Sequence, residues 1–339
     1  MLPIALGTYP TAVQHLAALS APGADLWVKR DDRTNGAYGG NKVRKLEIIL
    51  ARALAVGARR IVTVGAVGSH HVLATAYFGR QLGLDVEAVL FPQPRTGHAV
   101  EVLRAGLACG LRAFAARSMA AVPFMVGLRT VAGGRLVPPG GSNVDGASGY
   151  FHAARELAAQ VRSGAMPEPD VCVVALGSGG TAAGLAAGFA FERMKTRVVG
   201  VCVVPLRRAL GIVTTALARA CARRFGERLS HAAIGRCLTL DDRFLGRGYG
   251  HPTQDGEAAM RAAHDRASLL LDPTYTAKAF ACALWHVRAR RAGCTLYWNT
   301  LSSAPMQPLL ESAPPEGAVD PALIALLLPD GSPSPFPTP

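Results

Sequence analysis

Short apolar segments alternate with helical patterns along almost the whole sequence. The segments IVTV (61–64), VEAVLF (86–91) and VCVVAL (171–176) are typical of buried strands, and each precedes a segment with apolar residues at helical spacing. Successive parallel strands need a crossover long enough to hold a helix, so this alternation predicts mostly parallel sheets. We therefore expect an α/β fold in which open, twisted, mostly parallel sheets are flanked by helices.

The other elements follow the same pattern. Further strands are predicted at 26–30, 111–116, 198–204 and 295–300. Helices are predicted at 42–56, 71–82, 97–109, 148–161, 208–225, 254–267 and 272–292. A further helical stretch is predicted after the strand at 111–116, and one more helix ends near 194.

Composition and charge exclude several classes of protein. No apolar run reaches the roughly 18–20 residues that a membrane helix needs, and the N-terminus lacks the pattern of a secretory leader. The seven cysteines form no C-x-x-C pair, which favours reduced thiols in a cytoplasmic protein. The net charge of +13 comes from scattered arginines without a basic run. We therefore expect no nucleic-acid or membrane partner, and some attraction for anionic small molecules.

Lysine is rare in this arginine-rich chain. Five lysines stand against thirty-one arginines. Where only a positive charge was needed the chain uses arginine, so a retained lysine suggests a need for a primary amine. Schiff-base formation is one such need, because a guanidinium stays protonated and forms no imine.

The first motif is GGNKVRK, Gly39 to Lys45. Its glycines permit a tight turn, and Asn41 is a candidate helix cap that places Lys42 in the first helical turn. The positive end of a helix dipole disfavours an ammonium group, which lowers the lysine pKa. Lys45 lies one turn further on the same face. The alternative is a solvated Lys-Arg-Lys helix start.

The second motif is GSGGTAAG, Gly177 to Gly184, which follows a buried strand and opens a helix. Free N–H groups at a helix N-terminus, glycines that allow close approach and the hydroxyl of Thr181 are typical of a phosphate site. The motif lacks the G-K-[ST] of the Walker pattern, and its glycine spacing is wrong for a dinucleotide fold. The alternative is a plain strand-to-helix turn.

Two further segments carry polar groups ahead of helices. In GAVGSHHV (65–72), Ser69 and His70 are candidates to bind a carboxylate or a cofactor oxygen, and the alternative is a polar helix cap. Adjacent histidines point about 100° apart on a helix, so we expect no metal site there. In DPTYTAK (272–278), Tyr275 and Thr276 precede an apolar helix, whose start is marked by Asp272.

Taken together, these ordered segments resemble the 1-aminocyclopropane-1-carboxylate (ACC) deaminase and D-cysteine desulfhydrase family of fold-type II, tryptophan synthase β-like enzymes that use pyridoxal 5′-phosphate (PLP). The resemblance runs from VKRDD near Lys29 to the strand that ends at Thr300. It implies a large PLP-binding domain of residues 1–45 and 150–328, a small α/β domain of residues 46–149, and a homodimer. The Pro/Ser-rich residues 329–339 are expected to be a disordered tail.

The resemblance also implies roles for individual residues. Lys42 would form the Schiff base, Lys45 would lie near the phosphate, Ser69 would lie opposite Lys42, and Tyr249 and Tyr275 would be active-site tyrosines. The expected cofactor-binding residues are Lys42, Lys45, His70, Gly177, Ser178, Gly179, Gly180, Thr181 and Thr300, the last of which would face the pyridine nitrogen. The expected substrate-binding residues are Ser69, His70, His71 and Thr276.

The expected function is α,β-elimination on D-cysteine or a related β-substituted amino acid, which gives a 2-oxo acid, ammonia and the leaving group. Thr276 and Thr300 resemble the desulfhydrase side of the family, because ACC deaminases carry Glu and Leu at those positions. Two departures affect the pocket. His70 replaces an asparagine that would contact the cofactor ring oxygen, and Leu301-Ser302 replace two glycines.

Other functions stay open. Within the same fold these are ACC deamination, β-replacement, racemisation or chemistry on a specialised amino acid. A non-catalytic PLP-fold binding protein is a second class, and a nicotinamide-dependent oxidoreductase is suggested only by the glycines of 177–184.

Overall fold

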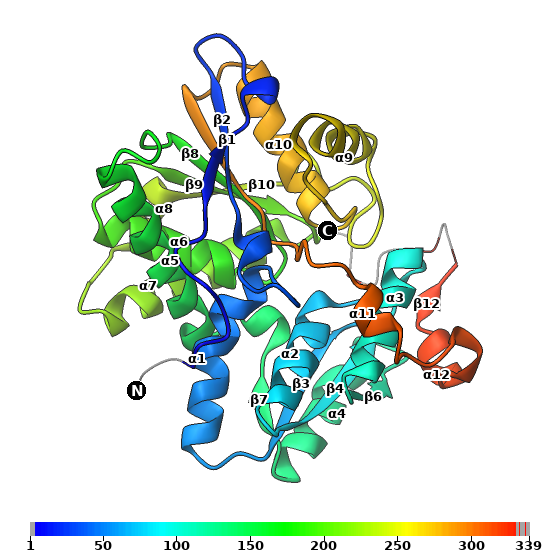
Figure 1. Cartoon of the computed structure of the whole chain (residues 1–339). Helices are drawn as coiled ribbons and strands as arrows, with labels where there is room; N and C mark the ends of the chain where they lie inside the picture. Colours follow the sequence, from blue (N-terminus) through cyan, green and yellow to red (C-terminus); the bar gives the residue numbers. More distant parts are fainter. Residues whose placement is uncertain (1–3, 330–331, 333–335, 337–339) are drawn as a thin grey trace.

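A computed structural model describes residues 4–329, 332 and 336 (Figure 1). Its strands are β1 (Val13–His15), β2 (Asp25–Lys29), β3 (Arg60–Ala66), β4 (Asp85–Phe91), β5 (Gln93–Pro94), β6 (Arg112–Ala115), β7 (Arg135–Val137), β8 (Val171–Leu176), β9 (Arg197–Cys202), β10 (Leu238–Asp241), β11 (Cys294–Trp298) and β12 (Leu327–Leu328). Its α-helices are α1 (Asn41–Ala55), α2 (His70–Gln81), α3 (Gly97–Ala108), α4 (Ala121–Val131), α5 (Val144–Arg162), α6 (Gly180–Phe191), α7 (Arg207–Arg224), α8 (His231–Cys237), α9 (Gln254–Ala267), α10 (Thr276–Arg288), α11 (Gln307–Leu310) and α12 (Pro321–Ile324). Single turns of 3₁₀ helix lie at Ala17–Leu19, Asp31–Arg33, Pro139–Gly141 and Glu316–Ala318.

The larger sheet has the strand order β1-β2-β11-β8-β9-β10 in the described part of the chain. The pairing of β1 with β2 is antiparallel, and every other pairing in this sheet is parallel. Alternate residues of β8 face opposite sides. Val171 and Val173 pack with α9 and α10, whereas Cys172 and Val174 pack with α5, α6 and α8. This sheet is therefore covered by helices on both faces, as parallel sheets usually are.

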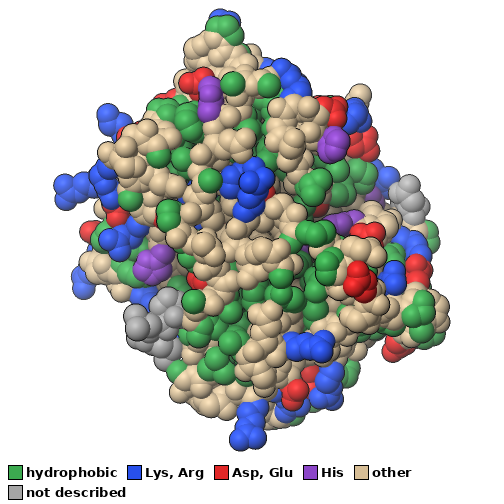
Figure 2. Space-filling model, in the orientation of Figure 1, with side chains coloured by type: hydrophobic (Ala, Val, Ile, Leu, Met, Phe, Trp, Pro, Cys, Tyr) green, Lys and Arg blue, Asp and Glu red, His purple; other side chains and the backbone are tan. Residues whose placement is uncertain are grey.

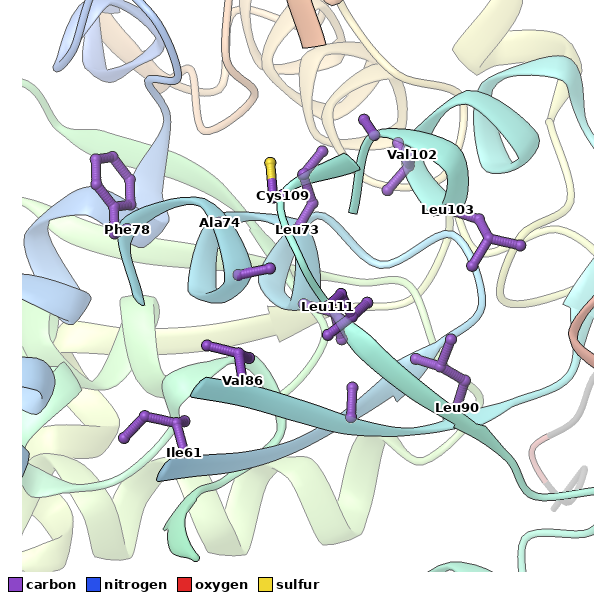
Figure 3. Packing of buried hydrophobic residues seen from close by; sticks show 14 of the residues in the cluster. Ile61, Leu73, Ala74, Phe78, Val86, Leu90, Val102, Leu103, Cys109 and Leu111 are labelled. Carbon is purple, nitrogen blue, oxygen red and sulfur yellow. The ribbon is translucent and has the colours of Figure 1, made fainter. Parts of the chain in front are cut away.

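The smaller sheet has the order β6-β4-β3-β7, and its pairings are all parallel among the described residues. One face packs on α1, α2 and α3, and Figure 3 shows Leu73 and Phe78 of α2 above Val86 and Leu90 of β4. The other face packs on α4. Both sheets thus confirm the predicted α/β class with flanking helices.

The C-terminal part of the chain returns to the smaller sheet. β12 pairs with β5, and Leu323, Leu326 and Leu327 are buried in the same hydrophobic cluster as α2 and α3. The prediction placed all of 150–328 in the large domain, but the residues beyond Met306 pack against the small one. Their leucines gave no signal of this, because an apolar segment does not specify which of two exposed faces it covers. The other domain boundaries stay predictions.

Most of the predicted tail, residues 329–339, lies outside the described residues. Phe336 is described, and its ring makes edge-to-face contacts with Phe91 and Tyr249. The expectation of a tail without fixed structure does not hold for this one side chain.

Most predicted elements occur within a few residues of their expected positions, but α1 starts differently. Its cap is Gly40, with φ of +91°, and Asn41 is the first helical residue. A side chain at Gly40 would collide with the backbone carbonyl of Thr300, 2.7 Å from the Cβ position, so glycine is needed there. The short strands β1, β5, β7, β10 and β12 and the short helices α8, α11 and α12 were not predicted.

Two expectations about surface and membrane can be compared with the structure. No helix among the described residues is both long and apolar enough to cross a bilayer. On the face shown in Figure 2, Lys and Arg side chains are scattered and form no continuous basic surface.

A buried carboxylate, Asp31, joins several elements. It accepts hydrogen bonds from Nε and Nη2 of Arg44, from the Tyr150 hydroxyl, from Nε1 of Trp298 and from the Thr11 hydroxyl, all at 2.7–2.9 Å. Burial by itself raises the pKa of Asp31, but the charge and hydrogen bonds of Arg44 outweigh it and hold that pKa below its ordinary value. The helix α1 is thereby tied to α5 and β11.

We predict that Asp31→Asn lowers the free energy of unfolding by about 3 kcal/mol near neutral pH, since it unbalances a buried charged network. Because the folded-state pKa is depressed, this stabilisation is present above the ordinary aspartate pKa of about 3.9 and is lost as the pH falls through the folded-state value. Urea unfolding at several pH values measures the difference, which should shrink in acid.

The matched control is Asp25→Asn, which removes an ion pair with His15 whose side chains are 52% and 38% exposed. It should change stability by less than about 0.5 kcal/mol. An equal loss in both variants would contradict a special role for Asp31.

Candidate active site

A cavity of about 270 Å³ lies where the two sheets meet. Loops that follow the carboxyl ends of β3, β8, β9 and β11 all border it, which is the usual place for ligands in open parallel sheets. The structure brings every predicted site residue to this cavity: Lys42, Lys45, Ser69, His70, His71, Gly177, Ser178, Gly179, Gly180, Thr181, Tyr249, Tyr275, Thr276 and Thr300. Their individual roles stay predictions.

Lys42 lies in the first turn of α1 and borders the cavity. Its Nζ donates a 2.8 Å hydrogen bond to Oδ1 of Asn41. Burial lowers the pKa of Lys42 to about 8, and the negative charge of Asp272 opposes that change. The lowered pKa was expected from the helix dipole, but burial is its main cause. A lysine in this state has an appreciable neutral fraction near neutral pH, as a nucleophilic amine requires.

Lys45 is almost fully buried one turn further along α1. Its Nζ donates to the carbonyl of Gly140 at 2.9 Å. Burial, together with the charge of Lys42, lowers the pKa of Lys45 well below its ordinary value. Two ammonium groups in one enclosed site repel each other, so the site favours an anionic ligand.

The N-terminus of α6 forms a concave turn next to Lys45. Gly179 has φ of +85°, and a Cβ there would lie 2.3 Å from Oγ1 of Thr214, a hydroxyl without a partner in the described structure. A Cβ on Gly180 would lie 3.2 Å from Nζ of Lys45. A side chain at Gly180 would therefore fill space next to the ammonium group, and one at Gly179 would collide with Thr214 of α7. This donor set suits a phosphate.

Hydroxyl groups complete this turn. Oγ of Ser142 lies 2.8 Å from Oγ of Ser178 and accepts the N–H of Gly180 at 3.1 Å. The Thr181 hydroxyl accepts a 3.2 Å hydrogen bond from Nδ2 of Asn41, so the side chain next to Lys42 also contacts the turn. Ser142 was not among the predicted residues. It follows Gly140 and Gly141, and its distance from the turn in the sequence gave no sign that the two would meet.

Ser302 and Leu301 replace two glycines of the expected pattern. The Ser302 hydroxyl accepts the N–H of Gly39 at 2.9 Å, which fixes the turn ahead of α1. Leu301 borders the cavity. The serine therefore has a structural partner, whereas the leucine narrows the site.

Two tyrosines that border the cavity are joined by a hydrogen bond. The Tyr275 hydroxyl donates to the Tyr249 hydroxyl at 2.8 Å, and the rings meet nearly edge to face. Burial raises the pKa of Tyr249 to about 12 although the hydrogen bond from Tyr275 lowers it, so Tyr249 stays protonated. Nζ of Lys278 donates to the carbonyls of Leu245 and Gly248 and thereby holds the loop that carries Tyr249.

Asp272 is the acidic side chain among the residues that line the cavity. Its carboxylate accepts the backbone N–H groups of Thr274, Tyr275 and Thr276, and also the Thr276 hydroxyl at 2.6 Å. The sequence predicted it as a helix-start residue, but α10 begins at Thr276 and Asp272 lies in the turn ahead of it. Both Asp272 and the Thr276 hydroxyl are therefore already engaged by hydrogen bonds.

Ser69 precedes α2 but does not cap it with its side chain. Gly65 makes room for it, because a Cβ on Gly65 would lie 2.8 Å from Oγ of Ser69. The alternative of a polar helix cap is thus not what the structure shows. The Ser69 hydroxyl is left to face the cavity, where it could bind a carboxylate.

The two adjacent histidines have different surroundings. Nε2 of His71 lies 2.9 Å from the Thr63 hydroxyl. Nδ1 of His70 lies 2.6 Å from the Tyr38 hydroxyl, and its Nε2 lies 2.7 Å from Nε2 of His98. Both ring nitrogens of His70 thus have protein partners, and Tyr38 brings a hydroxyl to the cavity that the sequence did not single out. Within the described residues, no group of three or more potential metal ligands gathers.

The residues of this cavity fit PLP. The glycine turn with Lys45 suits the phosphate, and Lys42 offers an amine of lowered pKa. Comparisons with known proteins agree with this. A family model described as pyridoxal-phosphate dependent enzyme matches residues 4–293.

Individual relatives are similar over most of their length. The chain is 38% identical over 284 residues to a D-cysteine desulfhydrase of Klebsiella pneumoniae, covering 80% of this chain and 84% of that protein. It is 35% identical to a putative ACC deaminase of Thermotoga maritima, covering 82% and 89%. The crystal structure of an ACC deaminase homologue matches with a TM-score of 0.79 at 28% identity, covering 92% of this chain and 96% of that one. The chain therefore belongs to the pyridoxal-phosphate dependent enzymes, with pyridoxal 5′-phosphate as its cofactor.

Proposed function

We propose that the protein catalyses α,β-elimination on D-cysteine or a closely related β-substituted amino acid. With D-cysteine, the substrate and one water would give pyruvate, ammonia and hydrogen sulfide. The observation that carries this choice is the state of Asp272 and Thr276. Ring opening of ACC benefits from a free carboxylate at this position, but Thr276 stands there and its hydroxyl is bonded to Asp272. Asp272 itself is saturated by backbone N–H groups.

Bound PLP supplies an electron sink that makes the α-proton acidic. The chain supplies the positioning and the proton transfers. The glycine turn at 177–181 and Lys45 hold the phosphate, and the hydroxyl of Ser69 binds the substrate carboxylate. Lys42, with a pKa of about 8, is poised to take a proton.

The tyrosine pair is suited to protonate the leaving group. Tyr275 uses its hydroxyl hydrogen to donate to Tyr249. The hydrogen of Tyr249 is then free to point into the cavity. Because the pKa of Tyr249 is raised to about 12, this group acts as a proton donor and not as a base.

ACC deamination is the second candidate, and the similarity to a putative ACC deaminase favours it.

The cytoplasmic location and the homodimer are parts of the same proposal. All seven cysteines are free, which agrees with a reducing compartment.

We predict that Lys42→Ala abolishes covalent cofactor attachment. In the wild-type apoprotein, the rate of attachment should rise with pH and level off above about pH 8, because the neutral amine is the reactive form and burial lowers its pKa to about 8. Stopped-flow absorbance after mixing with PLP measures this. Lys195→Ala, on an exposed lysine, is the control and should behave as wild type. Borohydride-reducible attachment in Lys42→Ala would disprove the assignment.

We predict that D-cysteine yields sulfide and pyruvate, and that ACC yields no ammonia. Tyr249→Phe should retain the cofactor absorption band but lower kcat with D-cysteine by roughly 10²–10⁴-fold, as expected when one positioned acid is lost. Sulfide and ammonia assays on D-cysteine, L-cysteine and ACC decide between the two candidates. Faster ammonia release from ACC would overturn the preferred function.

A further inference from the structure

Tyr38, His70 and His98 form a continuous hydrogen-bonded row from the cavity to the protein surface. Tyr38 borders the cavity, and its hydroxyl lies 2.6 Å from Nδ1 of His70. Nε2 of His70 lies 2.7 Å from Nε2 of His98, which is the second residue of α3 and is partly exposed to solvent. Both contacts join groups that can each give or accept a proton.

The number of protons in this row is fixed by its geometry. A hydrogen bond between two ring nitrogens holds one proton. Burial, together with the charge of the neighbouring His98, lowers the pKa of His70 to about 3, so His70 carries a single N–H at neutral pH. That N–H is either on Nδ1, facing Tyr38, or on Nε2, facing His98.

The charge state of His98 decides between these two arrangements. A protonated His98 must donate from Nε2, so His70 accepts there and carries its proton on Nδ1, which donates to the Tyr38 oxygen. The hydroxyl hydrogen of Tyr38 then points away from His70, into the cavity. With a neutral His98 that carries its proton on Nδ1, the whole row can reverse, and Tyr38 donates to His70.

We propose that Tyr38, His70 and His98 act as a proton relay between the active-site cavity and solvent. In the inward direction Tyr38 gives its proton to a group in the cavity and takes one from Nδ1 of His70. His70 takes one at Nε2 from His98, which ends neutral. At each step the donor loses one O–H or N–H bond and the acceptor gains one. The net result is that one proton enters the cavity and His98 loses its positive charge.

The relay rests on the proposed elimination, which both removes and consumes a proton. Lys42 takes one proton from the α-carbon, and Tyr249 gives one to the departing thiolate, so the cavity must release the first proton and regain the second. If the row carries one proton outward and one inward in each turnover, its protons return to their starting positions. In this scheme Tyr38 exchanges protons with the groups that line the cavity, and His70 and His98 are positioning residues.

Several charged groups surround the row. Lys42 on α1 and His98 on α3 disfavour a charge on His70, and Asp272, ahead of α10, favours it. Near His98, Glu101 lies one turn further along α3, and Arg95 is paired with Glu316. Because Glu101 is a charged group one turn from His98, a Glu101 variant serves as the control in the experiment below.

The test that does not depend on turnover is nitrogen NMR of the holoenzyme with ¹⁵N-labelled histidine. As His98 loses its proton, the two ring nitrogens of His70 should change shift at the same pH, because its proton moves from Nδ1 toward Nε2. In His98→Asn, which cannot become charged, the His70 signals should be constant with pH. Glu101→Gln, in the same stretch of α3, is the control and should preserve the coupled change. Unchanging His70 signals in the wild type, or a change that persists in His98→Asn, would overturn the relay.

The kinetic test uses the same variants with the substrate that the enzyme turns over. His98→Asn and Tyr38→Phe should each lower kcat by about 10²-fold with KM nearly unchanged, and His98→Asn should remove the corresponding limb of the kcat–pH profile. Circular dichroism and the cofactor band show whether each variant is folded and loaded. If no amino acid of the panel reacts, the proposed function fails, whereas the NMR result still decides the relay. A wild-type pH profile in His98→Asn would contradict it.

Discussion

The carboxylate of Asp31 is enclosed by protein and receives hydrogen bonds from four side chains that come from distant parts of the chain. A buried charge of this kind is tolerated only where its partners are fixed, because each lost partner leaves the charge uncompensated. Arg44 is the partner in α1, Tyr150 the one in α5, and Trp298 the last residue of β11. The first turn of α1 is thereby held against the end of β11, and that turn carries the cavity lysine. The position of the reactive amine thus depends on an ion pair that never contacts a ligand.

The cavity itself follows from the direction of the strands. Parallel strands bring their carboxyl ends to one edge of a sheet, so the loops after β8 and β11 meet in the larger sheet, and the loop after β3 joins them where the two sheets meet. Within those loops, the close approaches are made by backbone. Gly40 lies against the carbonyl of Thr300, and Gly179 lies against the hydroxyl of Thr214. Side chains at these glycines would separate the elements that the strands bring together.

Much of this could be predicted from the sequence, because periodicity fixes strands and helices locally and the glycine-rich loops mark where strands end. The rarity of lysine drew attention to Lys42 and Lys45, which both border the cavity. It is not specific, since Lys29 forms a buried ion pair with Glu156 and Lys278 holds a loop. Contacts between residues that are far apart in the sequence could not be predicted. His98 lies 28 positions from His70, and nothing local pairs them. The packing of Leu323, Leu326 and Leu327 on the smaller sheet could not be predicted for the same reason.

The closeness of Lys42 and Lys45 couples cofactor capture to the proton concentration. Burial lowers the pKa of both amines, and the charge of Lys42 also lowers the pKa of Lys45, so at least part of their positive charge is missing. A phosphate dianion at the α6 N-terminus would stabilise the protonated form of Lys45 and draw a proton from solvent as it binds. Loading would then be a proton-consuming reaction, with an enthalpy that varies with the ionisation heat of the buffer. Acid would promote the electrostatic part of binding while slowing the attack by Lys42, so affinity and attachment rate would have opposite dependences on pH.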